Sequence, residues 1–189
     1  ALCDEHELLL IFDEVQAGFA RTGKWFAYDN FGVTPDIMTL AKALCGGIAG
    51  AAMLTTPEIA PSLRPGMHAA TFGGNPIAAA AGIAAIEAIE EDDLLSHAET
   101  LAAVFQQRFQ QLAGECDLVH DIRIKGKMVG LELNVDATPV VGECMQRKLL
   151  LNCTQGTVIR LLPAINLTVE QAEQGCDVIC EAVKGLSNA

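Results

Sequence analysis

The first third of the chain alternates short apolar runs with polar residues. Residues 8–12 are continuously apolar, which is typical of a strand covered on both faces in a parallel sheet. Residues 36–41 form a second strand-like run, and residues 46–54 predict a glycine-rich turn followed by another buried strand. Residues 57–67 are rich in Pro and Gly, so we expect an exposed segment without regular structure.

Two helices are predicted next. Asn75 and Pro76 indicate a helix start, because Asn is a favoured N-cap and Pro a favoured first helical residue. This helix should run to about Glu90 and pack against the rest of the fold. Asp92 or Asp93 can cap a second helix, in which apolar residues recur at helical spacing: Leu94, Leu101, Val104, Phe105 and Leu112.

The period changes in the last third of the chain. Val129, Leu131 and Leu133 alternate with other residues, which predicts a half-buried strand. Residues 157–162 predict a further strand, and Thr168 with Gln171 forms a capping box for a last helix that runs to about residue 184. The order of these elements indicates an α/β protein with two domains, residues 1–91 and 92–189.

Composition excludes several classes of partner. The net charge of -12 comes from 24 acidic and 12 basic residues, and no Lys/Arg cluster interrupts it, which argues against a nucleic-acid or anionic-membrane partner. The longest apolar stretch, residues 76–89, is too short to span a bilayer. No signal-peptide pattern precedes the first strand, so we expect a cytoplasmic protein.

The cysteines are odd in number and scattered, which predicts buried reduced thiols: Cys3, Cys45, Cys116, Cys144, Cys153, Cys176 and Cys180. Two of them lie four residues apart, at 176 and 180, and would share one face of a helix. No histidine has a partner at ligand spacing, so no metal site is predicted.

The candidate chemistry lies where two strands end. Asp13 follows the first apolar run and Lys42 follows the second, and ligands of open α/β sheets sit outside the carboxyl ends of strands. An amine and a carboxylate in such positions suit pyridoxal phosphate, which needs a covalent amine and a counter-ion to a ring cation. Taken singly, a strand-end lysine is usually only solvated, and Asp13 could serve instead as a helix N-cap.

Four segments together resemble the class III aminotransferases: residues 11–16, 21–24, 34–44 and 68–76. Residues 152–168 are most similar to the acetylornithine branch of that class. The resemblance implies the C-terminal part of the type I pyridoxal-phosphate-dependent transferase fold, with residues 1–91 ending the large domain and 92–189 forming the small one. Family members are much longer than this chain, so we interpret it as a C-terminal half.

The resemblance also implies roles for five residues. Lys42 would condense with the cofactor aldehyde and later move the substrate proton, while Asp13 would keep the ring nitrogen protonated. Val15 would pack on the ring face, and Gln16 would contact the phenolic oxygen. Thr71 would bind the cofactor phosphate of an adjacent subunit, which implies a homodimer with shared sites. By contrast, Glu14 is assigned a structural role.

Arg160 lies on an otherwise apolar strand, where a buried guanidinium needs an anionic partner. The resemblance implies that this partner is the substrate α-carboxylate. Without the resemblance, an internal salt bridge would be the default interpretation.

The implied reaction is transamination of the terminal amine of N-acetylornithine with 2-oxoglutarate, in arginine biosynthesis. Alternatives are ornithine, succinylornithine or 4-aminobutyrate as substrate, or a truncated non-catalytic domain. Cys45 and Ala49 depart from the glycine and proline usual in the family.

Overall fold

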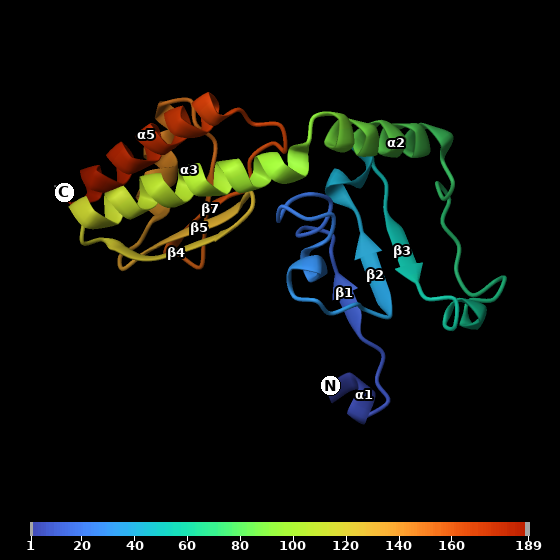
Figure 1. Cartoon of the computed structure of the whole chain (residues 1–189). Coiled ribbons are helices and arrows are strands. Elements are labelled where there is room, and N and C mark those ends of the chain that lie inside the picture. Colours follow the sequence, from blue (N-terminus) through green and yellow to red (C-terminus); the bar gives the residue numbers. More distant parts are fainter. Residues whose placement is uncertain (1, 188–189) are drawn as a thin grey trace. The chain divides into compact units, whose positions relative to one another are not determined.

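A computed structural model describes residues 2–187 and divides the chain into two compact units, with the boundary between Leu95 and Ser96 (Figure 1). The helices that it describes include none long and apolar enough to cross a membrane.

The first unit is a three-stranded sheet with one long helix and several short ones. Its strands are β1 (Ile11–Asp13), β2 (Ile37–Leu40) and β3 (Ala52–Thr55), in the spatial order β1-β2-β3. Strands β1 and β2 are parallel, and β3 runs antiparallel to β2. The helices are α1 (Leu2–Glu5), η1 (Ala27–Asn30), η2 (Lys42–Cys45), η3 (Ala60–Ser62) and α2 (Pro76–Glu91).

Helix α2 begins where the sequence predicts, and the amide N–H of Ile77 donates a 2.9 Å hydrogen bond to the Asn75 side chain. The segment expected to be irregular, residues 57–67, is exposed but contains the short helix η3.

The expected coverage of this sheet on both faces is wrong for the described residues. Strand β1 starts only at Ile11, and Leu8 and Leu9 before it are 59% and 57% exposed. Met53 and Leu54 on β3 are also exposed, as is Ile83 on α2, although we expected a buried strand and a packed helix there. The apolar pattern is that of a two-sided sheet, but three strands and one long helix supply too little chain to cover it.

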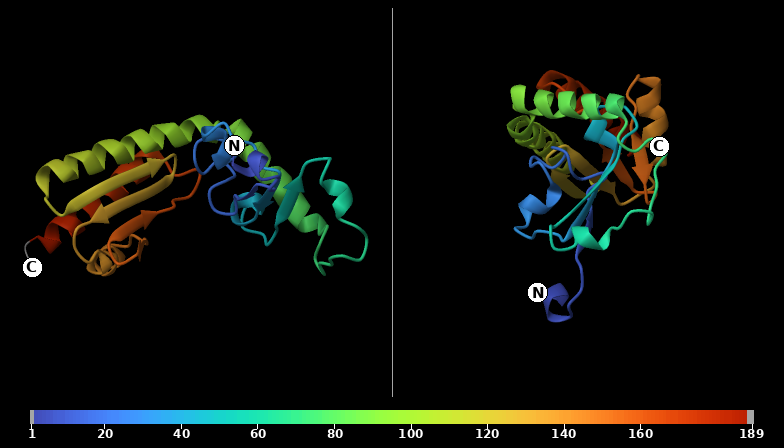
Figure 2. Two further views of the ribbon diagram at one scale, coloured as in Figure 1. Left: turned by 90° about the horizontal axis from the view of Figure 1, so that it is seen from below. Right: turned by 90° about the vertical axis from the view of Figure 1, so that its right-hand side faces the viewer.

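The second unit is a four-stranded antiparallel sheet in the order β4-β5-β7-β6. Its strands are β4 (Val119–Lys125), β5 (Met128–Leu133), β6 (Asn152–Thr154) and β7 (Val158–Leu161). The helices are α3 (Leu94–Glu115), whose first two residues belong to the first unit, α4 (Thr138–Gln146) and α5 (Val169–Leu186). Helices α3 and α5 cover one face of this sheet (Figures 1 and 2).

The core of this unit confirms the sequence pattern. The predicted residues Leu101, Phe105 and Leu112 of α3 are buried, and so are alternate residues of β5. The capping box of α5 is present, because the Thr168 hydroxyl accepts from the Gln171 amide and the Gln171 side chain accepts from the Thr168 amide, each at 3.1 Å. Strands β4 and β6 and helix α4 are additions that the sequence analysis does not predict.

Candidate functional site

Asp13 is held by one carboxylate oxygen only. Parallel pairing aligns Asp13 with Thr39 at the ends of β1 and β2. Its Oδ1 accepts hydrogen bonds from the Val15 amide at 3.0 Å and the Thr39 hydroxyl at 3.2 Å. Within the described residues Oδ2 has no partner, and the side chain is exposed. The next helix, η1, begins only at Ala27, so Asp13 is not a helix N-cap. Its hydrogen bonds within the turn and to Thr39 occupy one oxygen, and the other is available to a ligand.

In the neighbouring Glu14, by contrast, both carboxylate oxygens have hydrogen-bond partners. Its side chain is buried, and its two oxygens accept 2.9 Å hydrogen bonds from the backbone N–H groups of Ala27 and Tyr28. A Cβ on Gly18 would lie only 2.9 Å from the Glu14 carbonyl oxygen, so the chain can fold back here only with glycine. Glu14 thus closes the loop that contains Val15 and Gln16, both half-buried, and this is a structural role.

Lys42 follows β2 after one residue and begins the short helix η2. Its φ of 51° lies in the left-handed region, which costs a non-glycine residue about 1 to 2 kcal/mol. The side chain is exposed. Because β1 and β2 are parallel, their carboxyl ends meet at one edge of the sheet (Figure 1). Asp13 ends β1 and Lys42 follows β2 after one residue, so both lie at this edge. Strained backbone is enriched at functional positions.

Close packing against α2 fixes the segment after Lys42. A Cβ on buried Gly82 would lie 3.4 Å from the carbonyl oxygen of Leu44, so glycine lets the helix approach η2. A Cβ on Gly50 would lie 2.4 Å from Sγ of Cys45. The buried cysteine that departs from the family pattern therefore occupies space that only a glycine at position 50 leaves open.

Thr71 is exposed in the loop before α2. The loop residues 72–75 share the lining of a cavity of about 360 Å³ with Leu44 and Cys45 of η2. The loop that contains Thr71 therefore adjoins the helix that begins with Lys42. No hydrogen bond occupies the Thr71 hydroxyl or the Gln16 amide within the part of the chain that the structure describes.

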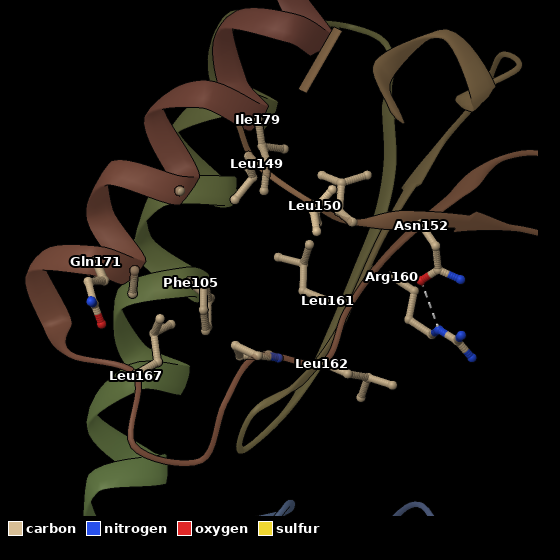
Figure 3. A pocket seen from close by; sticks show the side chains of 14 residues that line it. Phe105, Leu149, Leu150, Asn152, Arg160, Leu161, Leu162, Leu167, Gln171 and Ile179 are labelled. Atoms are coloured by element: carbon tan, nitrogen blue, oxygen red, sulfur yellow. Dashed lines mark hydrogen bonds between the residues drawn. The ribbon is translucent and has the colours of Figure 1, made fainter. Parts of the chain in front are cut away.

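Arg160 lies in the second unit, on β7, where its cross-strand neighbour on β6 is Asn152. The side chain is half-buried, not buried as we expected from the sequence. Its Nε donates to Oδ1 of Asn152 at 3.2 Å (Figure 3). No carboxylate of the described residues lies within 4.0 Å of it, so the default internal salt bridge is absent there.

Arg160 and Asn152 border a pocket of about 350 Å³ in the second unit. Figure 3 shows them at one side of it, and Phe105 and Leu167 at the other. The remaining lining is largely leucine, so the pocket is apolar with one cation at its margin. Sequence reasoning did not identify Asn152, although a hairpin across residues 155–157 would have indicated its pairing with Arg160.

The cysteines are free thiols, five of them buried and two, Cys3 and Cys153, only partly so. Burial raises the pKa of Cys176 to about 12, with a smaller contribution from Cys180. Thiols that remain protonated are poor metal ligands and poor nucleophiles. Among the described residues, no cluster of three or more His, Cys, Asp or Glu could hold a metal ion.

The chain is similar to known proteins over almost its whole length. The family Aminotransferase class-III matches residues 1–183. The acetylornithine aminotransferase of Methanothermobacter thermautotrophicus is 40% identical over 98% of this chain and 47% of its own length. A leucine/methionine racemase of Thermococcus litoralis is 41% identical over 96% of this chain and 43% of its own length. The ornithine aminotransferase of Toxoplasma gondii superposes with a TM-score of 0.92 at 30% identity, over 99% of this chain and 46% of that one.

The chain therefore spans about half the length of the curated relatives that it matches. Its two units reproduce the fold of a C-terminal portion of a pyridoxal-phosphate-dependent transferase. On the family match and this structural similarity, the chain belongs to the class-III aminotransferase family.

Proposed function

We propose that this sequence supplies the covalent lysine, the ring counter-ion and the carboxylate-binding arginine of an enzyme that transfers the terminal amine of N-acetylornithine to 2-oxoglutarate. The observation that carries the proposal is the sheet edge where Lys42, in strained backbone, and Asp13, with one unoccupied carboxylate oxygen, both lie. Similarity to acetylornithine aminotransferases over almost the whole chain supports the choice of donor.

The residues at this edge fit pyridoxal phosphate by their chemistry. They offer an exposed amine and a carboxylate with a free oxygen. The Thr71 hydroxyl, on a glycine-containing loop that adjoins η2, would serve the cofactor of an adjacent subunit. When bound, the cofactor supplies an aldehyde that takes up the amine and a ring that accepts the electrons left after proton removal. Lys42 would hold it covalently, and Asp13 Oδ2 would accept a hydrogen bond from the protonated ring nitrogen.

The proton transfer would also belong to Lys42. A primary amine released from its covalent bond can accept the proton from the substrate carbon and return it at a neighbouring carbon. Asp13 would favour the cationic ring by about 1 to 3 pKa units, as a nearby opposite charge does. Val15 would pack on the ring, Gln16 would contact the phenolic oxygen, and Thr71 would bind the phosphate of an adjacent subunit in a homodimer.

Arg160 would bind the α-carboxylate of 2-oxoglutarate, which adjoins the carbon that receives the amine. Its guanidinium has a neutral amide as partner, so its charge is not compensated by any carboxylate of the described residues. A planar fork of donors matches the two oxygens of a carboxylate.

Ornithine is the second candidate donor, because the similar Toxoplasma gondii structure is an ornithine aminotransferase. Glutamate formation with N-acetylornithine, ornithine, succinylornithine and 4-aminobutyrate in turn, by a family-length protein that contains this sequence, decides between the donors. Activity with none of them would favour a non-catalytic domain.

The covalent assignment can be tested on the 189-residue chain itself. We would add pyridoxal phosphate, record the visible spectrum, reduce with borohydride and locate the label by peptide mapping. The label should lie on Lys42, should persist in Lys24→Arg and should disappear in Lys42→Arg. A label on Lys24 or on another lysine would show that the central assignment is wrong.

A further inference from the structure

One row of residues crosses all four strands of the second unit in register. Arg123 on β4 is opposite Gly130 on β5, Gly130 is opposite Arg160 on β7, and Arg160 is opposite Asn152 on β6. Directly opposed residues of antiparallel strands point to the same face of the sheet. Two guanidiniums therefore share one face, with a residue that has no side chain between them.

The first of these arginines is fully compensated. Nη1 of Arg123 donates to Oδ2 of Asp121 at 2.7 Å and to Oε2 of Glu132 at 2.5 Å. These hydrogen bonds, that of Glu132 first, raise the pKa of Arg123 above its ordinary value. Two carboxylates for one cation leave no net positive charge at this end of the row, so Arg123 has a structural role.

The second arginine is oriented without being compensated. Asn152 engages only Nε of Arg160, and neither terminal nitrogen has an acceptor among the residues that the structure describes. On the other side, Gly130 has no side chain, and Arg123 lies over it: a Cβ at position 130 would be 3.9 Å from Nε and 4.0 Å from Nη2 of Arg123. An amide oxygen can accept a hydrogen bond and cancel no charge, whereas a carboxylate would both bind and neutralise the cation.

We propose that Asn152 is a positioning residue for Arg160. It holds Nε from the neighbouring strand, so that both terminal nitrogens stay directed to a substrate carboxylate and the positive charge remains available. This inference rests on the proposed function, because it assumes that Arg160 binds a substrate carboxylate. It adds the reason that position 152 carries an amide, where an acid would compete with the substrate.

The test follows the Nε–H signal of each arginine by NMR in a family-length protein that contains this sequence, with glutarate and then 2-oxoglutarate as probes. Loss of the Arg160 signal in Arg160→Lys and of the Arg123 signal in Arg123→Lys gives the assignments. Asn152→Ala should speed solvent exchange of the Arg160 Nε–H and weaken glutarate binding about two- to tenfold, the order of magnitude that one hydrogen bond gives. The Arg123 signal should not change.

Two further variants test whether the absence of charge at position 152 is what matters. Asn152→Asp should keep the Nε–H protected but weaken glutarate binding more than Asn152→Ala, because a charge now opposes the ligand. Thr154→Ala, on the same strand, is the matched control and should change neither quantity. If Asn152→Asp binds glutarate as well as the wild type, the argument from uncompensated charge is wrong.

A double variant shows whether Asn152 acts through Arg160. In an Arg160→Lys background, Asn152→Ala should have no further effect on affinity, and additive losses would overturn the inference. If Arg160→Lys weakens binding but Asn152→Ala does not, only the inference about Asn152 fails. If Arg160→Lys leaves affinity unchanged, both this inference and the proposed role of Arg160 fail.

Discussion

The substitution Asp13→Asn separates the two roles that the structure gives to this carboxylate. Oδ1 accepts from the Val15 amide and the Thr39 hydroxyl, while Oδ2 is free within the described residues. An asparagine retains one oxygen acceptor and can keep both of these hydrogen bonds, but it loses the negative charge. Asp13→Ala loses the charge and both hydrogen bonds, and is the matched comparison.

Loss of the hydrogen bonds should lower folding stability, whereas loss of the charge should lower kcat. Each of the two hydrogen bonds contributes about 0.5 to 1.5 kcal/mol, so Asp13→Ala should destabilise the end of β1 by roughly 1 to 3 kcal/mol, and Asp13→Asn by much less. A carboxylate beside a cationic ring shifts its pKa by about 1 to 3 units, at about 1.4 kcal/mol per unit. In a family-length protein both variants should therefore lower kcat by about 10- to 1000-fold, with a smaller loss of cofactor affinity.

Amide hydrogen exchange measures the structural role of Asp13, and kcat measures its role in catalysis. Hydrogen exchange of the Val15 amide should stay slow in Asp13→Asn and become fast in Asp13→Ala, while kcat falls in both. An unchanged kcat in Asp13→Asn would show that Asp13 only caps the loop. Fast exchange at Val15 in both variants would mean that the rate loss follows from local unfolding.

Four other outcomes are expected. Arg160→Lys should raise KM for 2-oxoglutarate about tenfold or more, because a bidentate charged contact with its α-carboxylate is lost; a change in stability alone would contradict this. Gly18→Ala should destabilise the loop by about 1 to 3 kcal/mol, since the new Cβ would lie 2.9 Å from the Glu14 carbonyl oxygen, and exchange of the Tyr28 amide should accelerate. Burial raises the pKa of Cys176 to about 12 from its ordinary value of 9.0, so the unfolded thiol ionises first and stability should fall between about pH 9 and pH 12. Cys176→Ala should reduce this slope in alkaline unfolding. The purified 189-residue chain should be inactive and should self-associate through its exposed apolar residues, which sedimentation and a glutamate assay would test; steady acetylornithine-dependent glutamate formation by its monomer would refute this.

Elements with local determinants were predictable from the sequence. Asn75 and Thr168 begin helices because their own side chains bind nearby amides, and these contacts need no knowledge of the rest of the fold. Helix α4 had a similar signal in Pro139 near its start and in Asp136, three residues earlier, whose side chain accepts from the Thr138 amide. Strand β4 alternates Ile122 and Ile124 with charged residues, but a register shift near Val119 interrupts the pattern.

Burial was not predictable in the same way. An apolar pattern indicates that a surface favours burial, but it does not indicate which element, if any, packs on it. Leu8 and Leu9 have the sequence of a buried strand and are exposed, since no described element packs on them. The partner of Arg160 also depends on non-local pairing. Only the register across the hairpin, which brings Asn152 opposite Arg160, shows that the expected anionic partner is an amide.

The candidate site residues are distinguished from their structural neighbours by unused binding capacity. Glu14 and Arg123 have their charges fully engaged by backbone amides and by two carboxylates, respectively. Asp13 and Arg160 are each held by one part of the side chain and have charged atoms without a partner among the described residues. Folding stability favours full pairing of charges. A charged residue that is held in place but left partly unpaired is therefore a position where a ligand can supply the missing contacts. By this criterion the variants at Asp13 and Arg160 should change catalysis more than stability, and those at Glu14 and Arg123 should do the reverse.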